Sequence, residues 1–209
     1  MVVHVSPALG AAFTQYTAEF EPDGVLGAAV GQRFVYVLDG QVEVEAGGET
    51  RNLCKDGYIY IPDGMPHACR SANGARAAVI EKRYAGIAGV KPPTLLMGRE
   101  LEAAGQPLMG DPDLLVRGLL PDNVAFDFAV NTMTYQPGAT LSMVEIHVME
   151  HGLLMLEGGG IYKLDESWYP VTAGDFIWMA AYCPQWFGAL GKAPAKYLIY
   201  KDWNRHPLG

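Results

Sequence analysis

The chain has 209 residues, of which half are apolar, 25 are glycine and 14 are proline. Its formal net charge of −8 argues against nucleic acid as a partner, because phosphate binding needs a basic surface that displaces counterions. No apolar run is long enough to span a bilayer, so we expect no membrane partner. The three cysteines, Cys54, Cys69 and Cys183, form no CxxC pair, which favours a reducing compartment, and we expect a cytoplasmic protein.

The first half of the chain is a series of short β-rich runs separated by glycine, proline and aspartate. Residues 34–48 alternate between apolar and polar, reach Asp39-Gly40 and alternate again, a pattern that predicts a β-hairpin. Residues 57–67 predict a strand that ends in a Pro-Asp-Gly turn just before His67. A lone histidine after such a turn is more often structural than catalytic, and we interpret His67 in this way.

The middle of the chain contains the one helical pattern, a short stretch at residues 98–106, GRELEAAGQ. Residues 126–138 then return to strand alternation, with Phe126, Phe128 and Val130 on one face. The chain is therefore predicted to be almost entirely β.

The second half of the sequence repeats the first. Three segments match in the same order and at similar intervals, which indicates two copies of one antiparallel unit. A single irregular β-sandwich with accidental similarity explains three ordered matches less well. The matched segments are 36–42 with 154–162, 56–67 with 174–185, and 77–84 with 196–203.

Residues 144–152, VEIHVMEHG, carry two of the five histidines, His147 and His151. Their spacing fits the H-x-x-E-H pattern of a zinc-protease helix, in which Glu150 would be the general base. The alternative is strand, turn and strand. The repeat favours this alternative, because it aligns the stretch with the strand-like residues 32–40.

A metal site on strands needs a turn inside this stretch. Glu145 and His147 are two residues apart, so they point to the same face of a strand. A straight strand would separate His147 from His151 by about 13 Å, whereas each ligand of an ion lies only ~2 Å from it. We therefore expect the chain to turn between Val148 and Glu150.

A fourth ligand has to come from outside this stretch. The repeat nominates Gln185, which occupies the position of His67 in the first copy; considered alone, it would be interpreted as a surface polar residue. Carboxylate and amide oxygens combined with imidazole nitrogens suit Mn²⁺ or Fe²⁺ better than a thiolate-rich zinc site does. The alternative is that these are ordinary polar residues on a sheet face.

The pattern E-x-H-x3-H-x6-G at residues 145–158 resembles the first cupin motif, and the stretch that ends at Gln185 resembles the second. In the first half, the turn before His67 also resembles the second motif, but the matching first motif has no H-x-H. The resemblance implies an all-β bicupin, two jelly-roll-type β-barrels in tandem, with a metal site in the C-terminal barrel only.

The predicted domains follow from this resemblance. Residues 1–88 form a degenerate N-terminal barrel without metal, residues 89–112 a linker, and residues 113–209 the metal-binding C-terminal barrel. Since strand alternation begins at the first residues, the first barrel is expected to lack strands at its N-terminal end.

Over most of its length the chain is similar to the (S)-ureidoglycine aminohydrolase family of allantoin breakdown. The most specific segments are EIHVMEHG at 145–152, GGGIYKLDESWYPVTAGDFIWMAAYCPQ at 158–185 and YLIYKDWNR at 197–205. The resemblance implies that Mn²⁺ is bound by Glu145, His147, His151 and Gln185. It also implies that a small-molecule substrate is contacted by Glu145, Gln185, Tyr197 and Lys201, of which Glu145 and Lys201 would be catalytic.

The reaction implied by the resemblance is the hydrolytic release of ammonia from (S)-ureidoglycine to give (S)-ureidoglycolate, and we expect a homo-oligomer. One alternative is another metal cupin, such as a dioxygenase or an isomerase of a small carboxylate, because a fold does not determine its chemistry. A second is a metal-dependent binding protein without turnover. Lys201 could also be an edge-strand lysine that discourages aggregation, and Tyr197 could be a core residue with a satisfied hydroxyl.

Overall fold

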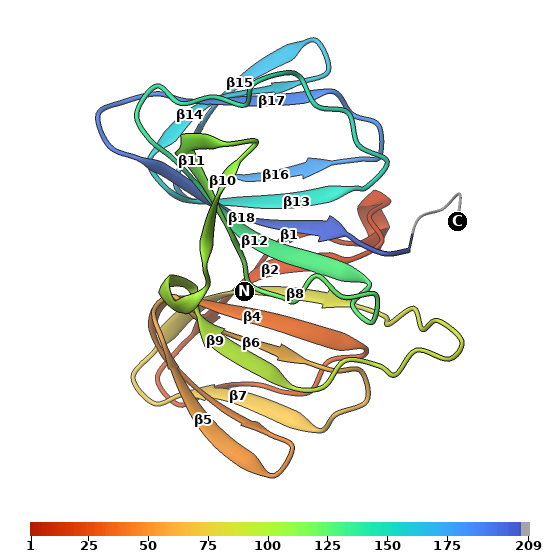
Figure 1. Ribbon diagram of the computed structural model, residues 1–209. Coiled ribbons are helices and arrows are strands. Elements are labelled where there is room, and N and C mark those ends of the chain that lie inside the picture. Colours follow the sequence, from red (N-terminus) through yellow and green to blue (C-terminus); the bar gives the residue numbers. More distant parts are fainter. Residues whose placement is uncertain (206–209) are drawn as a thin grey trace. The chain divides into compact units, whose positions relative to one another are not determined.

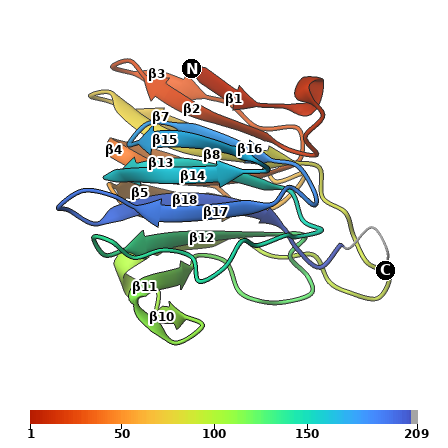
Figure 2. The same cartoon turned by 90° about the horizontal axis from the view of Figure 1, so that it is seen from above.

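The computed structural model describes residues 1–205, in which nearly all regular structure is β-strand. The chain divides into two compact units, Met1–Glu102 and Ala103–Gly209, and each is built from two β-sheets (Figures 1 and 2). The prediction of an all-β chain with two tandem barrels is confirmed. Within residues 1–205, no helix is long and apolar enough to cross a membrane.

The first unit has one sheet in the order β1-β2-β8-β4-β6-β9 and a second in the order β3-β7-β4-β5. Its interior is filled by buried aliphatic side chains such as Val35, Val42, Ile59 and Val79. Its elements are β1 (Val2–Val5), a 3₁₀ turn (Pro7–Leu9), β2 (Thr14–Phe20), β3 (Gly24–Leu26), β4 (Gln32–Ala46), β5 (Glu49–Cys54), β6 (Gly57–Ile61), β7 (His67–Ser71), β8 (Ala75–Lys82), β9 (Leu96–Arg99) and a second 3₁₀ turn (Glu100–Glu102).

Strand β4 belongs to both sheets of the first unit, so the predicted hairpin at Asp39-Gly40 is wrong. The strand continues for 15 residues; its first half pairs with β6 and β8, and its second half pairs with β5 and β7. Gly40 has a φ of 74°, and a Cβ there would lie 2.7 Å from the Gly74 carbonyl oxygen. The glycine therefore permits a bend between sheets, where the sequence suggested a tight turn.

The predicted helix at residues 98–106 is also wrong, because only Glu100–Glu102 form a helical turn, of the 3₁₀ type. The Glu100 N–H donates to the Asp56 carbonyl at 2.9 Å, and the Tyr36 hydroxyl donates to the buried Glu100 carboxylate at 2.6 Å. These bonds attach the segment to the first unit. They use groups of Glu100 in contacts with distant residues, and the segment forms only a single helical turn.

The predicted linker at residues 89–112 contains strands. The division between the two units, after Glu102, falls inside it. Its strand β9 pairs with β6 of the first unit, whereas β10 pairs with β11 of the second. The connection between the units is therefore shorter than the 89–112 segment.

The second unit has a six-stranded sheet in the order β10-β11-β12-β18-β13-β16 and a three-stranded sheet in the order β15-β14-β17. Its core includes the aromatic residues Tyr135, Tyr162, Phe187 and Tyr197. Its strands are β10 (Gly105–Leu108), β11 (Asp111–Gly118), β12 (Phe128–Tyr135), β13 (His151–Glu157), β14 (Gly159–Leu164), β15 (Ser167–Thr172), β16 (Phe176–Met179), β17 (Gln185–Ala189) and β18 (Ala195–Asp202).

The two units repeat each other down to the strand register. The β4–β8 pair has an irregularity between Val37 and Asp39, and the β13–β18 pair has one between Met155 and Glu157. Counting from these irregularities, the pair Arg33–Glu81 of the first unit corresponds to the pair His151–Lys201 of the second. The same count along β4–β7 and β14–β17 makes His67 equivalent to Gln185. The repeat inferred from the sequence is confirmed.

Candidate active site

The proposed ligand segment is a loop that enters β13 through a bend. Residues 144–150 contain no helix; the backbone bends at Val148 and Met149, and β13 begins at His151. The bend is the turn that the strand interpretation requires, and it brings the His147 ring to 5.1 Å from the His151 ring, measured between centroids. The zinc-protease helix is thereby excluded.

Glu145 and Gln185 are neighbours because their backbones pair. The Glu145 N–H donates to the Gln185 carbonyl at 2.8 Å, and the reverse bond measures 2.9 Å. Gln185 is the first residue of β17 and its side chain is buried. A residue nominated only by the internal repeat thus lies beside the carboxylate proposed from the motif.

The donor atoms of this loop have the separations expected of ligands that share an ion. Oε2 of Glu145 lies 3.1 Å from Nε2 of His147, and the rings of His147 and His151 are nearly parallel, at 17°. Donors about 2 Å from one ion are about 3 Å apart at adjacent corners of an octahedron, and the centres of two bound imidazoles are then about 5 Å apart. The 3.1 Å separation, which is also that of a hydrogen bond between His147 and Glu145, and the 5.1 Å separation of the two rings are compatible with this arrangement.

His151 is held in the tautomer that a metal ligand needs. Its Nδ1–H donates to the Met149 carbonyl at 3.0 Å, so the lone pair is on Nε2. Burial lowers the pKa of His151 to about 3, and the charges of His147 and Lys201 act in the same direction. The imidazole is therefore neutral at physiological pH, which is the form that binds metal.

The side chain of Gln185 is oriented by Tyr162, a buried residue of β14. The Tyr162 hydroxyl donates to Oε1 of Gln185 at 3.0 Å. An amide oxygen has two lone pairs, so this bond leaves one for an ion or a substrate. Burial raises the pKa of Tyr162, which keeps the phenol in its neutral, donating form.

Tyr197 lies in the same interior and is paired with Tyr135. Their hydroxyl oxygens are 2.7 Å apart, and burial raises the pKa of both phenols. The charge of Glu145 raises both pKa values further, so Glu145 is close enough to act on the two hydroxyls. Simple packing explains the ring of Tyr197, while its hydroxyl is hydrogen-bonded to Tyr135 and lies within the influence of the Glu145 charge.

Lys201 is an internal cation and not an edge residue. Its strand, β18, lies between β12 and β13, and Lys201 is paired across the sheet with His151. Burial lowers the pKa of Lys201, whereas the carboxylates of Glu145 and Asp122 raise it. The interpretation as an edge-strand lysine is therefore wrong.

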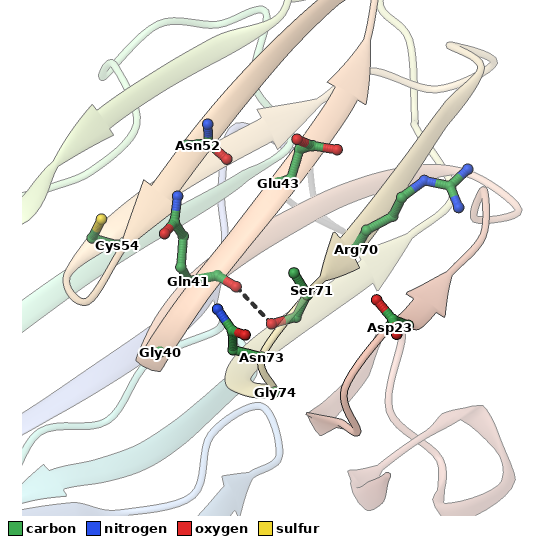
Figure 3. Close-up of a pocket in the computed structure, with 11 residues that line it drawn as sticks. Asp23, Gly40, Gln41, Glu43, Asn52, Cys54, Arg70, Ser71, Asn73 and Gly74 are labelled. Carbon is green, nitrogen blue, oxygen red and sulfur yellow. Dashed lines mark hydrogen bonds between the residues drawn. The ribbon is translucent and has the colours of Figure 1, made fainter.

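The first unit has a separate polar pocket of about 690 Å³ over β4, β5 and β7, shown in Figure 3. Ser71 donates a hydrogen bond to the Gln41 carbonyl at its edge. The described lining residues contain no imidazole, so this pocket lacks the donors of the loop at Glu145. The lining residues are Asp23, Gly40, Gln41, Glu43, Asn52, Cys54, Arg70, Ser71, Ala72, Asn73 and Gly74.

Known proteins match both units. The Cupin domain family matches residues 18–81 and 131–200. A probable (S)-ureidoglycine aminohydrolase of Oryza sativa subsp. japonica is 42% identical over 98% of this chain and 66% of its own length. The (S)-ureidoglycine aminohydrolases of Arabidopsis thaliana and Escherichia coli K12 are 40% and 33% identical, over 98% and 96% of this chain and 69% and 79% of their own lengths. The chain belongs to the (S)-ureidoglycine aminohydrolase family.

Solved structures agree with the cupin fold of this aminohydrolase family member. Protein Ylba from E. coli has a TM-score of 0.86 at 30% identity, over 98% of this chain and 82% of its own. A putative glyoxylate-induced protein from Pseudomonas aeruginosa has a TM-score of 0.85 at 31% identity, over 93% and 75%. The oxalate decarboxylase of Bacillus subtilis, which has Mn(II) centres, has a TM-score of 0.72 at 14% identity, a likeness of fold alone.

The donors of this aminohydrolase family member fit a divalent ion of the Mn²⁺ type. They are one carboxylate, one amide oxygen and two imidazoles, a mixture of oxygen and nitrogen that such ions accept. Within residues 1–205, no group of three or more His, Cys, Asp and Glu side chains suffices by itself to hold an ion.

Sequence analysis missed four polar side chains around this site. Tyr135 and Asn131 lie on β12, Tyr162 on β14, and Trp203 just after β18. The residues next to each of them in the sequence carry no local sign of its polar contact. Their partners lie far away in the sequence: the pairing of β12 with β18 and of β14 with β17 supplies three of them, and the loop at Asp122 supplies the partner of Trp203.

Proposed function

We propose that this chain is a metal-dependent hydrolase that releases ammonia from (S)-ureidoglycine and gives (S)-ureidoglycolate, a step of allantoin breakdown. The observation that carries the proposal is the proximity of Glu145, His147 and His151 beside the half-buried cation of Lys201. Its relatives at 33–42% identity bear the name of this activity.

The proposed cofactor is Mn²⁺, held by Glu145, His147, His151 and Gln185. When bound, the ion supplies positive charge that orients the polar groups of the substrate and stabilises charge that develops on them. Two observations support the ligand set: the neutral imidazole of His151, with its lone pair on Nε2, and the amide of Gln185, oriented by the Tyr162 hydroxyl.

Lys201 is proposed to bind the carboxylate of the substrate. The reacting carbon of ureidoglycine carries a carboxylate, an amine and a ureido group. An ammonium forms a charge-assisted hydrogen bond with a carboxylate, which is stronger than a bond between neutral groups. Tyr197 and Gln185 then offer neutral hydrogen-bonding groups to the other substituents.

The proposed reaction exchanges the amine for the hydroxyl of water. The carbon–nitrogen bond breaks, a carbon–oxygen bond to the water oxygen forms, and one proton of water leaves with the amine as ammonia. Glu145 is the carboxylate beside the reacting carbon in this orientation, and we assign it the movement of that proton.

The test is an ammonia-release assay on ureidoglycine generated in situ from allantoate, with and without Mn²⁺. We expect ammonia in stoichiometric amount with ureidoglycolate, and only in the metal-loaded protein. Consumption of oxygen with Fe²⁺ and no release of ammonia would identify a dioxygenase. Binding of ureidoglycine without turnover would identify a binding protein, and either result would overturn the proposal.

We further propose that the protein is a cytoplasmic homo-oligomer. None of its cysteines forms a disulfide within the described residues, which suits a reducing compartment. Large apolar side chains are exposed around the loop of the site, including Met143, Ile146 and Tyr182, and contiguous exposed apolar residues are typical of contact surfaces. Light scattering coupled to gel filtration would check the assembly, and a monomeric mass would contradict it.

A further inference from the structure

The ammonium of Lys201 has a defined set of neighbours, which we call the lysine subsite: Lys201, Asn131 and Trp203. Asn131 lies on β12 two residues beyond Ala129, the residue opposite Lys201, and therefore on the same face of the sheet. With its amide nitrogen donating to the Val130 carbonyl at 3.0 Å, its oxygen accepts from Nζ of Lys201 at 3.1 Å. The backbone bond thus fixes which end of the amide faces the lysine.

Trp203 covers another side of the same ammonium. Nζ of Lys201 lies 5.3 Å from the centre of the Trp203 ring, within the range of a cation–π interaction. The indole N–H donates to Oδ1 of Asp122 at 2.9 Å. The ring is therefore tethered at its nitrogen while one face meets the cation, and the Asp122 carboxylate adds a favourable charge.

The loop that carries Asp122 is itself attached to Asn204 and Arg205, which follow β18. Nδ2 of Asn204 donates to the carbonyls of Asn123 and Phe126 at 3.0 and 3.1 Å. Arg205 donates to the Val124 carbonyl at 2.9 Å. These bonds hold the residues around Asp122 against the segment that follows β18, so the position of the indole ring is determined from both sides.

A lysine needs such constraints if it is to bind one carboxylate in one place. Its four-carbon stem has many rotamers, and its ammonium has three N–H donors. One N–H of the Lys201 ammonium is hydrogen-bonded to Asn131, whereas the contact with the face of the Trp203 ring uses no N–H in a hydrogen bond. The remaining donors are available to a ligand, and Lys201 lies opposite His151 across the sheet, with its charge acting on that residue.

We infer that Asn131 and Trp203 are positioning residues that hold the ammonium of Lys201 for the substrate carboxylate. The inference rests on the proposed function in that it uses Lys201 as the carboxylate-binding group. Within residues 1–205, the side-chain contacts of these two residues described above are with Lys201, Val130 and Asp122. Their effect therefore belongs to substrate binding and passes through Lys201 alone.

The experiment compares Asn131→Leu, Trp203→Leu and Trp203→Phe in the metal-loaded protein. Removing the acceptor or the ring face should raise KM for ureidoglycine about three- to tenfold with kcat nearly unchanged, since a contact kept in the transition state affects binding uniformly. Trp203→Phe keeps a ring face and should recover part of the loss. Trp168→Leu removes an exposed indole of β15 and is the matched control, with no expected change.

A double-mutant cycle separates positioning from a general structural role. In a Lys201→Met background, adding Asn131→Leu or Trp203→Leu should cause no further loss, because the residue through which they act is already gone. Full additivity of the losses would overturn the inference. A fall in kcat with unchanged KM in the single variants would overturn it as well.

Calorimetric titration with glycolate, a simple carboxylate, makes the test independent of turnover. We expect wild type to bind glycolate more tightly than Asn131→Leu or Trp203→Leu, and Lys201→Met to abolish the difference. If wild type releases no ammonia but this pattern of binding is found, the proposed function fails and the lysine subsite stands. Equal glycolate affinity in wild type and both single variants would overturn the inference that Asn131 and Trp203 position Lys201, whatever the activity.

Discussion

The two barrels place different charges at equivalent positions of one strand register. Arg33 of the first barrel corresponds to His151 of the second, and Glu81 corresponds to Lys201. A cation faces a carboxylate in the first pair, whereas an imidazole faces a cation in the second.

In the first barrel this register produces a closed network. The buried guanidinium of Arg33 donates to Glu81 at 2.7 and 2.9 Å, to the Gly27 carbonyl at 2.6 Å and to Nε2 of His67 at 2.8 Å. Tyr16 donates to the same Glu81 oxygen at 2.7 Å. His67 is interpreted from the sequence as structural. Its Nε2 lone pair accepts a hydrogen bond from Arg33, while its Nδ1–H donates to the Met65 carbonyl.

The difference teaches how one fold can hold or omit a metal. An arginine side chain is a permanent cation with five donors, so it can satisfy the acceptors of a barrel interior without an ion. In the second barrel the equivalent position has an acceptor, His151, and the neighbouring acceptors converge on the same region. We therefore expect metal in the second barrel alone.

Of the substitutions that test this difference between the two barrels, His147→Ala is expected to have the largest effect on activity. Loss of one imidazole should remove bound Mn²⁺ and lower ammonia release at least a hundredfold, while the strands keep the barrel folded. Elemental analysis should give one Mn²⁺ per chain for wild type and none for the variant. His67→Ala, the control in the first barrel, should keep its metal; two ions per wild-type chain would break the comparison.

Arg33→Met tests the internal cation of the first barrel. The change leaves the Glu81 carboxylate without its partner, and we expect a loss of roughly 3 kcal/mol in the free energy of unfolding. Urea denaturation measures it, with Mn²⁺ content expected to stay at the wild-type level. Replacing both partners, as Arg33→Met with Glu81→Leu, should restore part of the loss; unchanged stability of the single variant would show that the network is not needed.

Lys201→Met tests the opposite charge at the position of Glu81. A charge-assisted hydrogen bond to a carboxylate is worth roughly 1.5–3 kcal/mol, which corresponds to about a ten- to hundredfold decrease in kcat/KM. Steady-state kinetics should show this decrease while Mn²⁺ remains bound. Full activity would mean that the substrate carboxylate binds elsewhere, and loss of the metal would make Lys201 part of the ligand environment.

The smallest expected effect is the loss of stability of the metal-free protein at acidic pH. Folding lowers the pKa of His151 from its ordinary 6.5 to about 3, so the unfolded chain binds the extra proton between these values and stability falls as the pH falls. For His151 alone we expect a loss of about 1 kcal/mol between pH 7 and pH 5.5. His67, whose pKa burial also lowers, adds in the same direction. A His151→Gln variant should have a shallower pH dependence, and an identical slope would contradict the assignment.

Much of the fold could be predicted because alternation and repetition are properties of the chain itself. The strand register of the structure repeats in the two units as the sequence does, and it makes Gln185 the equivalent of His67. The turn before Glu150 could be deduced because only a turn lets ligands four residues apart share an ion.

The rest depended on contacts between distant segments. Asp39-Gly40 has the composition of a hairpin turn, yet the strand continues because Gly40 passes close to the start of β8. The segment at Glu100 has a helical composition, but its hydrogen bonds to Asp56 and Tyr36 favour a single turn. Likewise, nothing near Trp203 in the sequence points to Asp122.

His151 and Gln185 are each the first residue of a strand, and Glu145 and His147 lie in the loop just before one. At these strand beginnings the pairing continues from the next residue onward. A duplicated barrel can therefore lose or gain its chemistry through a few substitutions at its rim. Arg33 and His151 occupy equivalent positions near such strand starts, and they differ together with their cross-strand partners Glu81 and Lys201. The division of labour between the two halves is thus readily accessible to evolution.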